Sequence, residues 1–153
     1  IGSPAYAFGA VYVPANGNRL WKLNAATGEV IWSVASEGDK FGHSSPRVEG
    51  SRIYVAGLGD RGKLMCLDAV TGKEIWAGYT GSTIYDSSPA IGEDFVVIGS
   101  VGSLLSAFDK ATGTSLGSYR LRDGHFLASP AVKGDRIFAG TFNDRVTALR
   151  LER

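Results

Sequence analysis

The stretch Cys66-Leu67-Asp68-Ala69-Val70-Thr71-Gly72-Lys73-Glu74-Ile75-Trp76 decides the fold, because its central Thr-Gly pair is one copy of a repeated landmark. The same pair stands at Thr27-Gly28 and at Thr112-Gly113, so neighbouring copies are 41 to 44 residues apart. A tryptophan follows at a fixed distance in two of the copies, as Trp32 and Trp76. A sequence that repeats itself at one period is built from copies of one structural unit.

A second landmark, the dipeptide Ser-Pro, repeats with nearly the same period. It occurs at intervals of 41 to 43 residues, at Ser3-Pro4, Ser45-Pro46, Ser88-Pro89 and Ser129-Pro130. Two independent landmarks therefore share one period, and a period of about 40 to 45 residues is typical of a four-stranded β-propeller blade. The sequence predicts a single domain over residues 1–153 with four blades, at about 1–40, 41–83, 84–124 and 125–153.

Each unit is predicted to consist of short antiparallel strands, because no window shows helical periodicity. In the second unit, apolar and β-branched runs predict strands, from innermost to outermost, at 45–48, 52–57, 63–68 and 74–77. Asn, Asp and Gly occupy the breaks between the runs and tolerate the positive φ of tight turns. The fourth unit predicts three strands, at 129–132, 136–140 and 145–151, without a Thr-Gly turn or an outermost strand.

The composition agrees with an all-β domain and argues against several classes of function. Of 153 residues, 44% are hydrophobic and 21 are glycine, which fits many tight turns between short strands. The formal net charge of +1 argues against a nucleic-acid partner or an anionic membrane surface. Cys66 is the one cysteine, so neither an intrachain disulfide nor a CxxC metal site is possible. No apolar run has the length of a transmembrane helix.

The stretch around Thr71-Gly72 resembles the tryptophan-docking motif A-x-D-x-x-T-G-x-x-x-W of the quinoprotein-like, or PQQ-repeat, β-propeller family. In this motif the Thr-Gly turn reverses the chain, so that the tryptophan on the outer strand packs flat against a neighbouring blade. Such an indole buries roughly 150 to 250 Å². The resemblance assigns blade docking to Thr27, Gly28, Trp32, Asp68, Thr71, Gly72, Trp76, Asp109, Thr112 and Gly113.

The chain departs from the motif at several positions. Lys22 and Cys66 stand where the motif has alanine, and Asn24 stands where it has aspartate. Gly117 replaces the tryptophan of the third unit, so the third docking site is expected to be weakened. Trp21 does not occupy a docking position and is expected in the core or at the rim.

The missing strand of the fourth unit leaves the ring open. Residues Ile1-Gly2 are too short to supply that strand, so we expect the C-terminal part of a seven- or eight-bladed propeller, and the resemblance suggests eight. The alternatives are a closed four-bladed ring and a homodimer that completes an eight-bladed ring. An open set of blades would expose the apolar flanks of its first and last members.

Candidate binding residues lie in loops. The loops that lead into the innermost strands are expected to line the channel mouth, where His43, Asp86 and Leu127 share one repeat position. His43 and Asp86 could form a polar ligand or metal contact, although two groups are too few for a zinc or calcium site. The alternative is a solvated histidine and a turn-capping aspartate. His125 and Arg61, each in a loop or turn, complete the candidate set.

The resemblance leaves three functions open. Quinone-dependent dehydrogenases of the family hold pyrroloquinoline quinone and calcium at the propeller axis, and they typically carry a vicinal cysteine pair that the single Cys66 cannot provide. No Ser-His-Asp order, HExxH or P-loop occurs either.

The leading hypothesis is therefore a non-catalytic scaffold without cofactor, similar to the lipoprotein propeller of the outer-membrane β-barrel assembly machinery. It would bind a protein or a small ligand at its channel face. A fragment of a quinone-dependent dehydrogenase and a sensor propeller of a multidomain protein are the alternatives. A periplasmic or extracellular location is expected, because proteins with this resemblance are mostly exported.

Overall fold

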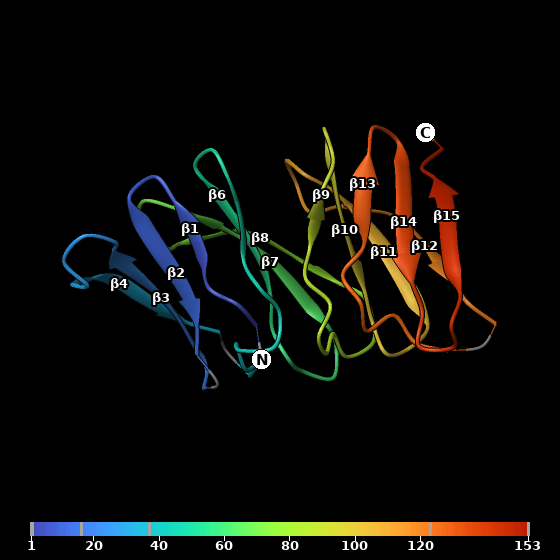
Figure 1. Cartoon of the computed structure of the whole chain (residues 1–153), viewed down its shortest axis with the longest axis horizontal. Helices are drawn as coiled ribbons and strands as arrows, with labels where there is room; N and C mark the ends of the chain where they lie inside the picture. The colour runs from blue at the N-terminus through green and yellow to red at the C-terminus, as the bar shows by residue number, and fades with distance from the viewer. Residues whose placement is uncertain (1, 16, 37, 123, 153) are drawn as a thin grey trace.

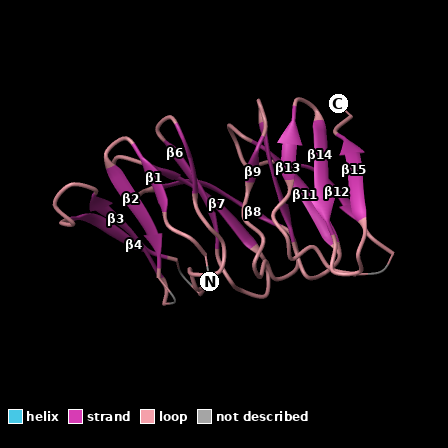
Figure 2. Ribbon diagram, viewed as in Figure 1, coloured by secondary structure: helices cyan, strands magenta, loops and turns pink. Residues whose placement is uncertain are grey.

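A row of four antiparallel sheets makes up the computed structural model, which describes residues 2–15, 17–36, 38–122 and 124–152 (Figure 1). The described residues form strands and loops without a helix (Figure 2). Three sheets have four strands each, and the fourth sheet has three. The prediction of an all-β fold of about four propeller blades, the last without its outermost strand, is confirmed. The sheets are called blades 1 to 4 in chain order.

Each blade is a meander of sequential strands. Blade 1 contains β1 (Ala5–Ala7), β2 (Ala10–Pro14), β3 (Arg19–Asn24) and β4 (Val30–Ala35). Blade 2 contains β5 (Arg47–Glu49), β6 (Arg52–Ala56), β7 (Lys63–Asp68) and β8 (Glu74–Tyr79). Blade 3 contains β9 (Ala90–Ile91), β10 (Phe95–Gly99), β11 (Leu104–Asp109) and β12 (Ser115–Arg120). Blade 4 contains β13 (Ala131–Lys133), β14 (Arg136–Gly140) and β15 (Val146–Arg150).

The first strands of the blades begin after the Ser-Pro dipeptide, and the predicted start of the first strand of blade 2 at Ser45 is therefore two residues too early. The reason is that the backbone amide of this serine donates a hydrogen bond to the serine hydroxyl of the next blade, and not to a strand of its own sheet. The Ser3 amide donates to Ser45 Oγ at 2.8 Å, the Ser45 amide to Ser88 Oγ at 2.8 Å, and the Ser88 amide to Ser129 Oγ at 2.9 Å. These four serines form a serine belt that joins all four blades along their inner edge.

The serine belt predicts a specific loss on mutation. In Ser88→Ala the part-buried Ser45 amide loses its acceptor, and loss of such a hydrogen bond costs about 0.5–1.5 kcal/mol. We expect the urea midpoint of unfolding to fall with an unchanged slope. Ser115→Ala is the control, because Ser115 is exposed on the outer strand β12. Equal midpoints for the two variants would contradict a role for the belt.

The hydrophobic core lies between the blades. One cluster spans the junction of blades 1 and 2, where Tyr12 and Leu20 pack with Ile53 and Met65. Equivalent clusters fill the junctions of blades 2 and 3 and of blades 3 and 4. Each of the inner blades therefore buries one face against the preceding blade and the other against the following blade.

Each docking tryptophan packs on the Thr-Gly turn of the following blade. A methyl group on Gly72 would lie 3.2 Å from ring atoms of Trp32, and one on Gly113 would lie 2.6 Å from ring atoms of Trp76. The indole Nε1 of Trp76 donates to the carbonyl oxygen of Lys110 at 3.1 Å. Trp32 makes the equivalent but longer bond, 3.4 Å, to Ala69. Glycine is required at these turns because the ring occupies the space of a side chain.

A cation shares each of these carbonyl acceptors, a feature that the sequence analysis missed. Lys22 Nζ donates to the Ala69 carbonyl at 2.7 Å, and an Arg52 guanidinium nitrogen donates to the Lys110 carbonyl at 2.7 Å. Lys22, which departs from the motif alanine, therefore has a defined role at its junction. The two cations come from different strands, β3 and β6, and this explains why no single repeat position revealed them.

The aspartate of the motif organises the turn. Asp68 Oδ1 accepts hydrogen bonds from the Val70 amide, the Thr71 amide and the Thr71 hydroxyl at 2.6–2.9 Å. Asp109 holds its turn in the same way. Asn24 retains the two amide bonds but not the hydroxyl bond, because the Thr27 hydroxyl donates to Glu29 instead.

The bonds to Asp68 predict a pH dependence. Hydrogen bonds from Thr71 hold the pKa of this carboxyl below its ordinary value of 3.8. A lowered native pKa stabilises the fold fully above the unfolded pKa, and this contribution is lost as the pH falls through the native pKa. We expect Asp68→Asn, which mimics Asn24, to reduce the loss of stability between pH 5 and pH 2, measured by urea unfolding at each pH. An acid profile identical to that of the unmodified chain would contradict this assignment.

The junction of blades 3 and 4 has no docking tryptophan within the described residues. Gly117 pairs with Ala107 as Trp76 pairs with Cys66, and nothing lies within 4 Å of a methyl group built on Gly117. A groove of about 210 Å³ remains beside it, lined by residues that include Leu105, Tyr119 and Leu149. Blades 3 and 4 are held by the cluster around Val97, Phe126 and Ile137 instead.

Candidate functional site

The loops of the chain gather at two faces. Because successive strands of a meander reverse direction, the loops that enter each blade lie at one end of the strands and the Thr-Gly turns at the other. The entry face is defined here by the loops 38–46, 80–89 and 124–130. The turn face is defined by the turns 49–51, 68–73, 92–94 and 109–114. In Figure 1 the hairpin between β13 and β14 marks the turn face at the top of the view.

On the entry face the structure brings His43 and Asp86 together. His43 Nδ1 and Asp86 Oδ1 are 3.1 Å apart, and they come from the loops that enter blades 2 and 3. The Tyr85 ring lies beside the imidazole, with 4.7 Å between ring centroids. The His43 side chain is 19% exposed and that of Asp86 is 48% exposed, so the carboxylate faces solvent while the imidazole is half-buried. These three residues are called the entry cluster.

The other two candidates have partners elsewhere. The Arg61 guanidinium stacks on the Tyr79 ring at 4.1 Å, which places it at the outer strand β8 and not at the inner edge. His125 Nδ1 bonds to the backbone carbonyl of Val101. Tyr85 is a site residue that was not predicted from the sequence, although it stands next to Asp86.

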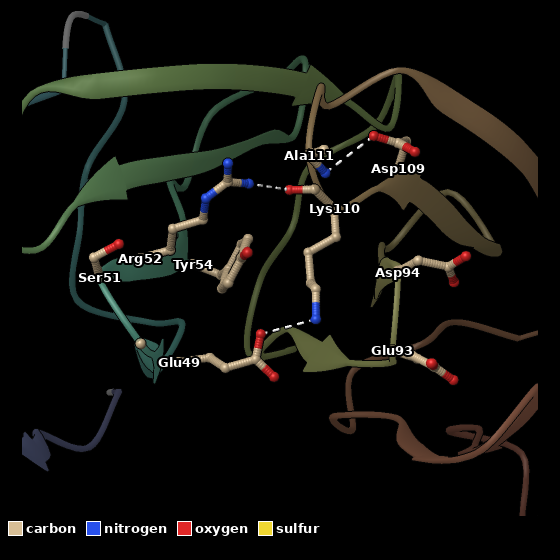
Figure 3. Close-up of a pocket in the computed structure, with 10 residues that line it drawn as sticks. Glu49, Ser51, Arg52, Tyr54, Glu93, Asp94, Asp109, Lys110 and Ala111 are labelled. Carbon is tan, nitrogen blue, oxygen red and sulfur yellow. Dashed lines mark hydrogen bonds and ion pairs between the residues drawn. The ribbon is translucent and has the colours of Figure 1, made fainter.

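On the turn face a cavity of about 480 Å³ opens between blades 2 and 3 (Figure 3). Lys110 crosses it from blade 3 and bonds to Glu49 Oε2 at 2.8 Å and to the Gly92 carbonyl at 3.0 Å. Tyr54 and Arg52 line the side that belongs to blade 2. The cavity is thus bridged by an ion pair that joins two blades.

Two buried groups under this cavity are kept un-ionised. Burial raises the pKa of Tyr54 to about 12 and that of the Cys66 thiol to about 11. The Tyr54 hydroxyl has no hydrogen-bond partner among the described residues, and after burial the groups that act on its pKa are Cys66, Arg52 and Glu49. A thiol without thiolate character is a poor nucleophile, so Cys66 acts as a core residue.

Neither face presents a metal centre within the described residues. Among residues 2–15, 17–36, 38–122 and 124–152, no three His, Cys, Asp or Glu side chains converge on a common point. Cys66 is completely buried in the core at the junction of blades 2 and 3. The described part of the chain also contains no helix long and apolar enough to cross a membrane.

The geometry agrees with the comparison to known proteins. The family described as outer membrane protein assembly factor BamB matches residues 19–153. The chain belongs to this family. The BamB-type match covers blades 2 to 4 and the strands β3 and β4 of blade 1, including all three Thr-Gly turns. The resemblance to quinoprotein-like propellers, and to the assembly lipoprotein type in particular, is confirmed.

The relatives of this chain include both outer membrane protein assembly factors and quinone-dependent alcohol dehydrogenases. BamB of Bordetella pertussis is 28% identical over 92% of this chain and 38% of its own length. The dehydrogenase subunit of the quinone alcohol dehydrogenase of Gluconobacter oxydans is 32% identical over 73% of this chain and 18% of its own length. The crystal structure of BamB from Moraxella catarrhalis superposes with a TM-score of 0.75 at 19% identity, over 94% of this chain and 43% of that chain. The chain spans less than half the length of each of these proteins.

Proposed function

We propose that this BamB-type segment is a non-catalytic scaffold that binds a partner protein through its entry face. The observation that carries the proposal is the entry cluster, in which an imidazole, an aromatic ring and a solvent-facing carboxylate from two blades lie together. Aromatic residues in a polar surround are typical of protein–protein interfaces. The cluster has no reactive serine, thiol or lysine bonded to His43 among the described residues, so binding suits it better than catalysis.

The polar side chains described on the turn face hold the fold together, and this leaves the entry cluster as the candidate for contact with a partner. Arg52, Lys110 and Glu49 join blades, and Asp68 and Asp109 hold turns. Several relatives are named as outer membrane protein assembly factors, and we extend a role in assembly to this chain. A periplasmic or extracellular location and a ring completed by further blades or by a second copy belong to this proposal. The sensor hypothesis stays a prediction.

The proposal predicts a site-specific crosslink. A photo-crosslinking amino acid at Tyr85, in cells that produce the protein, is expected to yield an adduct of one defined mass, because Tyr85 lies at the centre of the proposed surface. The control position is Val30, which is exposed to a similar degree, 55% against 44% for Tyr85, but lies on the outer strand β4. Adducts are resolved by immunoblot and identified by mass spectrometry. Identical adduct patterns at both positions, or no adduct at Tyr85, would rule the entry face out.

A quinone-dependent dehydrogenase is the second candidate, favoured by the 32% identity with the Gluconobacter enzyme. It is tested by titrating the chain with pyrroloquinoline quinone and calcium while tryptophan fluorescence is recorded. We expect no saturable quenching, because the described residues offer no group of metal ligands. Saturable quenching that requires calcium would favour the dehydrogenase and displace the scaffold proposal.

A further inference from the structure

Two neighbouring cavities open on the turn face, one at each junction between blades 1, 2 and 3. The cavity between blades 2 and 3 is the one of about 480 Å³ in Figure 3. The cavity between blades 1 and 2 has a volume of about 320 Å³, and Phe8, Tyr12 and Val70 are among the residues that line it. The turn Gly50-Ser51 lines both cavities, so it is their common wall. Blades 1 to 3 alone form both cavities.

The cavity between blades 1 and 2 has large apolar side chains at its rim and is called the apolar pocket. Phe8 of blade 1 is 79% exposed, and Val70 of blade 2 is 70% exposed. The other blades have smaller or charged residues at these two repeat positions, namely Gly50, Glu93 and Gly134 in place of Phe8 and Ala26 and Ala111 in place of Val70. The chain therefore departs from its own repeat on both sides of one cavity, each time towards a larger apolar side chain. Apolar side chains that gather in solvent mark interaction surfaces.

The backbone of Phe8 points to the same use. Phe8 and Gly9 form the two-residue turn between β1 and β2, at the top of the view in Figure 1, and have φ values of +50° and +72°. Turns with two positive φ values favour Asn or Gly at the first position, because a bulky side chain is strained there. The Phe8 ring contributes little to the core, since most of it is exposed. A strained and exposed aromatic residue is explained by a contact with a partner.

The cavity between blades 2 and 3 is called the acidic pocket. Among the described residues that line it, four carry carboxylates and two are cations. Both cations already have acceptors in the chain, because Lys110 bonds to Glu49 and Arg52 donates to the Lys110 carbonyl. Glu93 is exposed at the rim. The Tyr54 hydroxyl is completely buried and has no hydrogen-bond partner among the described residues. A basic side chain from outside would complement the excess of carboxylates and give this hydroxyl a donor.

We propose that the two pockets together bind an extended segment of a partner protein that carries a large apolar side chain within a few residues of a lysine or arginine. The apolar side chain lies between Phe8 and Val70, and the basic side chain lies against Glu93. The common wall Gly50-Ser51 has small side chains, so the backbone of the segment can cross it from one pocket to the other. The surface lies at the opposite end of the strands from the entry cluster, so this inference does not depend on the function proposed above.

The first test is a selection of peptides from a phage-displayed library of random sequences, followed by fluorescence anisotropy of the selected peptides. We expect these peptides to combine a large apolar residue with lysine or arginine. Phe8→Asn should raise their dissociation constant by at least about 10-fold. Phe142→Asn is the matched control, because Phe142 is 70% exposed but lies in the loop between β14 and β15, at the other end of the strands. Failure to enrich any peptide, enrichment of acidic peptides, or an equal effect of the two substitutions would overturn the proposal.

Phe8→Asn also separates binding from folding. Asparagine tolerates a positive φ, so the urea midpoint of this variant should equal or exceed that of the unmodified chain while peptide binding is weakened. A lower midpoint for Phe8→Asn would mean that Phe8 serves the fold, and it would overturn the assignment of this residue to a partner.

Glu93→Lys tests the acidic pocket. The reversed charge should weaken binding of the selected peptides by at least about 10-fold and reduce the dependence of their affinity on salt. Asp60→Lys is the control, since Asp60 is an exposed carboxylate in the loop between β6 and β7, at the other end of the strands. Equal effects of the two charge reversals would contradict the proposal. Vesicles of equal parts phosphatidylcholine and phosphatidylglycerol are the second probe, and binding to them that is lost in Phe8→Asn would assign the surface to a membrane instead.

Discussion

Trp76→Ala is expected to destabilise the chain by about 3–5 kcal/mol, because it removes a buried indole and leaves a cavity at the junction of blades 2 and 3. Trp76 is 7% exposed, its ring rests on Gly113, and its Nε1 donates to Lys110. The change is measured as the free energy of unfolding from urea denaturation, followed by far-ultraviolet circular dichroism. A lower dependence of the free energy of unfolding on urea concentration would indicate that blades 1–2 and 3–4 unfold separately once Trp76 no longer joins them.

Trp76→Phe separates packing from hydrogen bonding at the same site. Phenylalanine keeps an aromatic ring over Gly113 but cannot donate to the Lys110 carbonyl, which retains the bond from Arg52. We expect a loss well below that of Trp76→Ala, with about 1 kcal/mol due to the hydrogen bond. Equal losses for the two variants would show that packing of the ring contributes little.

Gly113→Ala is expected to destabilise the chain by about 2–5 kcal/mol, from two separate causes. The residue has a φ of +75°, where an L side chain costs about 1–2 kcal/mol. The new methyl group would also lie 2.6 Å from Trp76 ring atoms, and forcing such a contact apart costs about 1–3 kcal/mol more. The same urea measurement applies, and quenching or a shift of tryptophan fluorescence should report the displaced ring.

Gly28→Ala provides the matched control. Gly28 has the same φ of +75° in the equivalent turn of blade 1, but nothing lies within 4 Å of the added methyl group. Its substitution should therefore cost only the backbone strain. The difference between the two losses of free energy of unfolding measures the clash of the added methyl group with Trp76. Similar losses would mean that the Trp76 ring moves aside without destabilising the chain.

The fold could be read from the sequence because its signals are local and repeated. The Thr-Gly and Ser-Pro landmarks set the period, and the runs between them set the strands, so the strands at 63–68 and 136–140 have the predicted bounds. The first strands were placed too early, because a Ser-Pro pair looks like part of a strand while its serine is bonded to the next blade.

The candidate site was less accessible to sequence reasoning. His43 and Asp86 were chosen for their shared repeat position, and the structure places them in contact. Arg61 and His125 were chosen as polar loop residues, but their stacking and backbone contacts take them away from that pair. The bridge from Lys110 to Glu49 joins residues 61 positions apart and had no sequence signal.

The sequence by itself determined the number of blades, the order of the strands and the positions of the docking tryptophans. This was possible because turn-forming residues and the alternation of apolar and polar residues are signals within a few residues of chain, and they recur with each repeat. Only the tertiary structure decided which groups meet across a junction: the serine belt, the two cations on the turn carbonyls and the entry cluster. These contacts depend on the lateral offset between neighbouring blades. The packing of whole blade faces sets this offset, so the sequence of one repeat does not predict it.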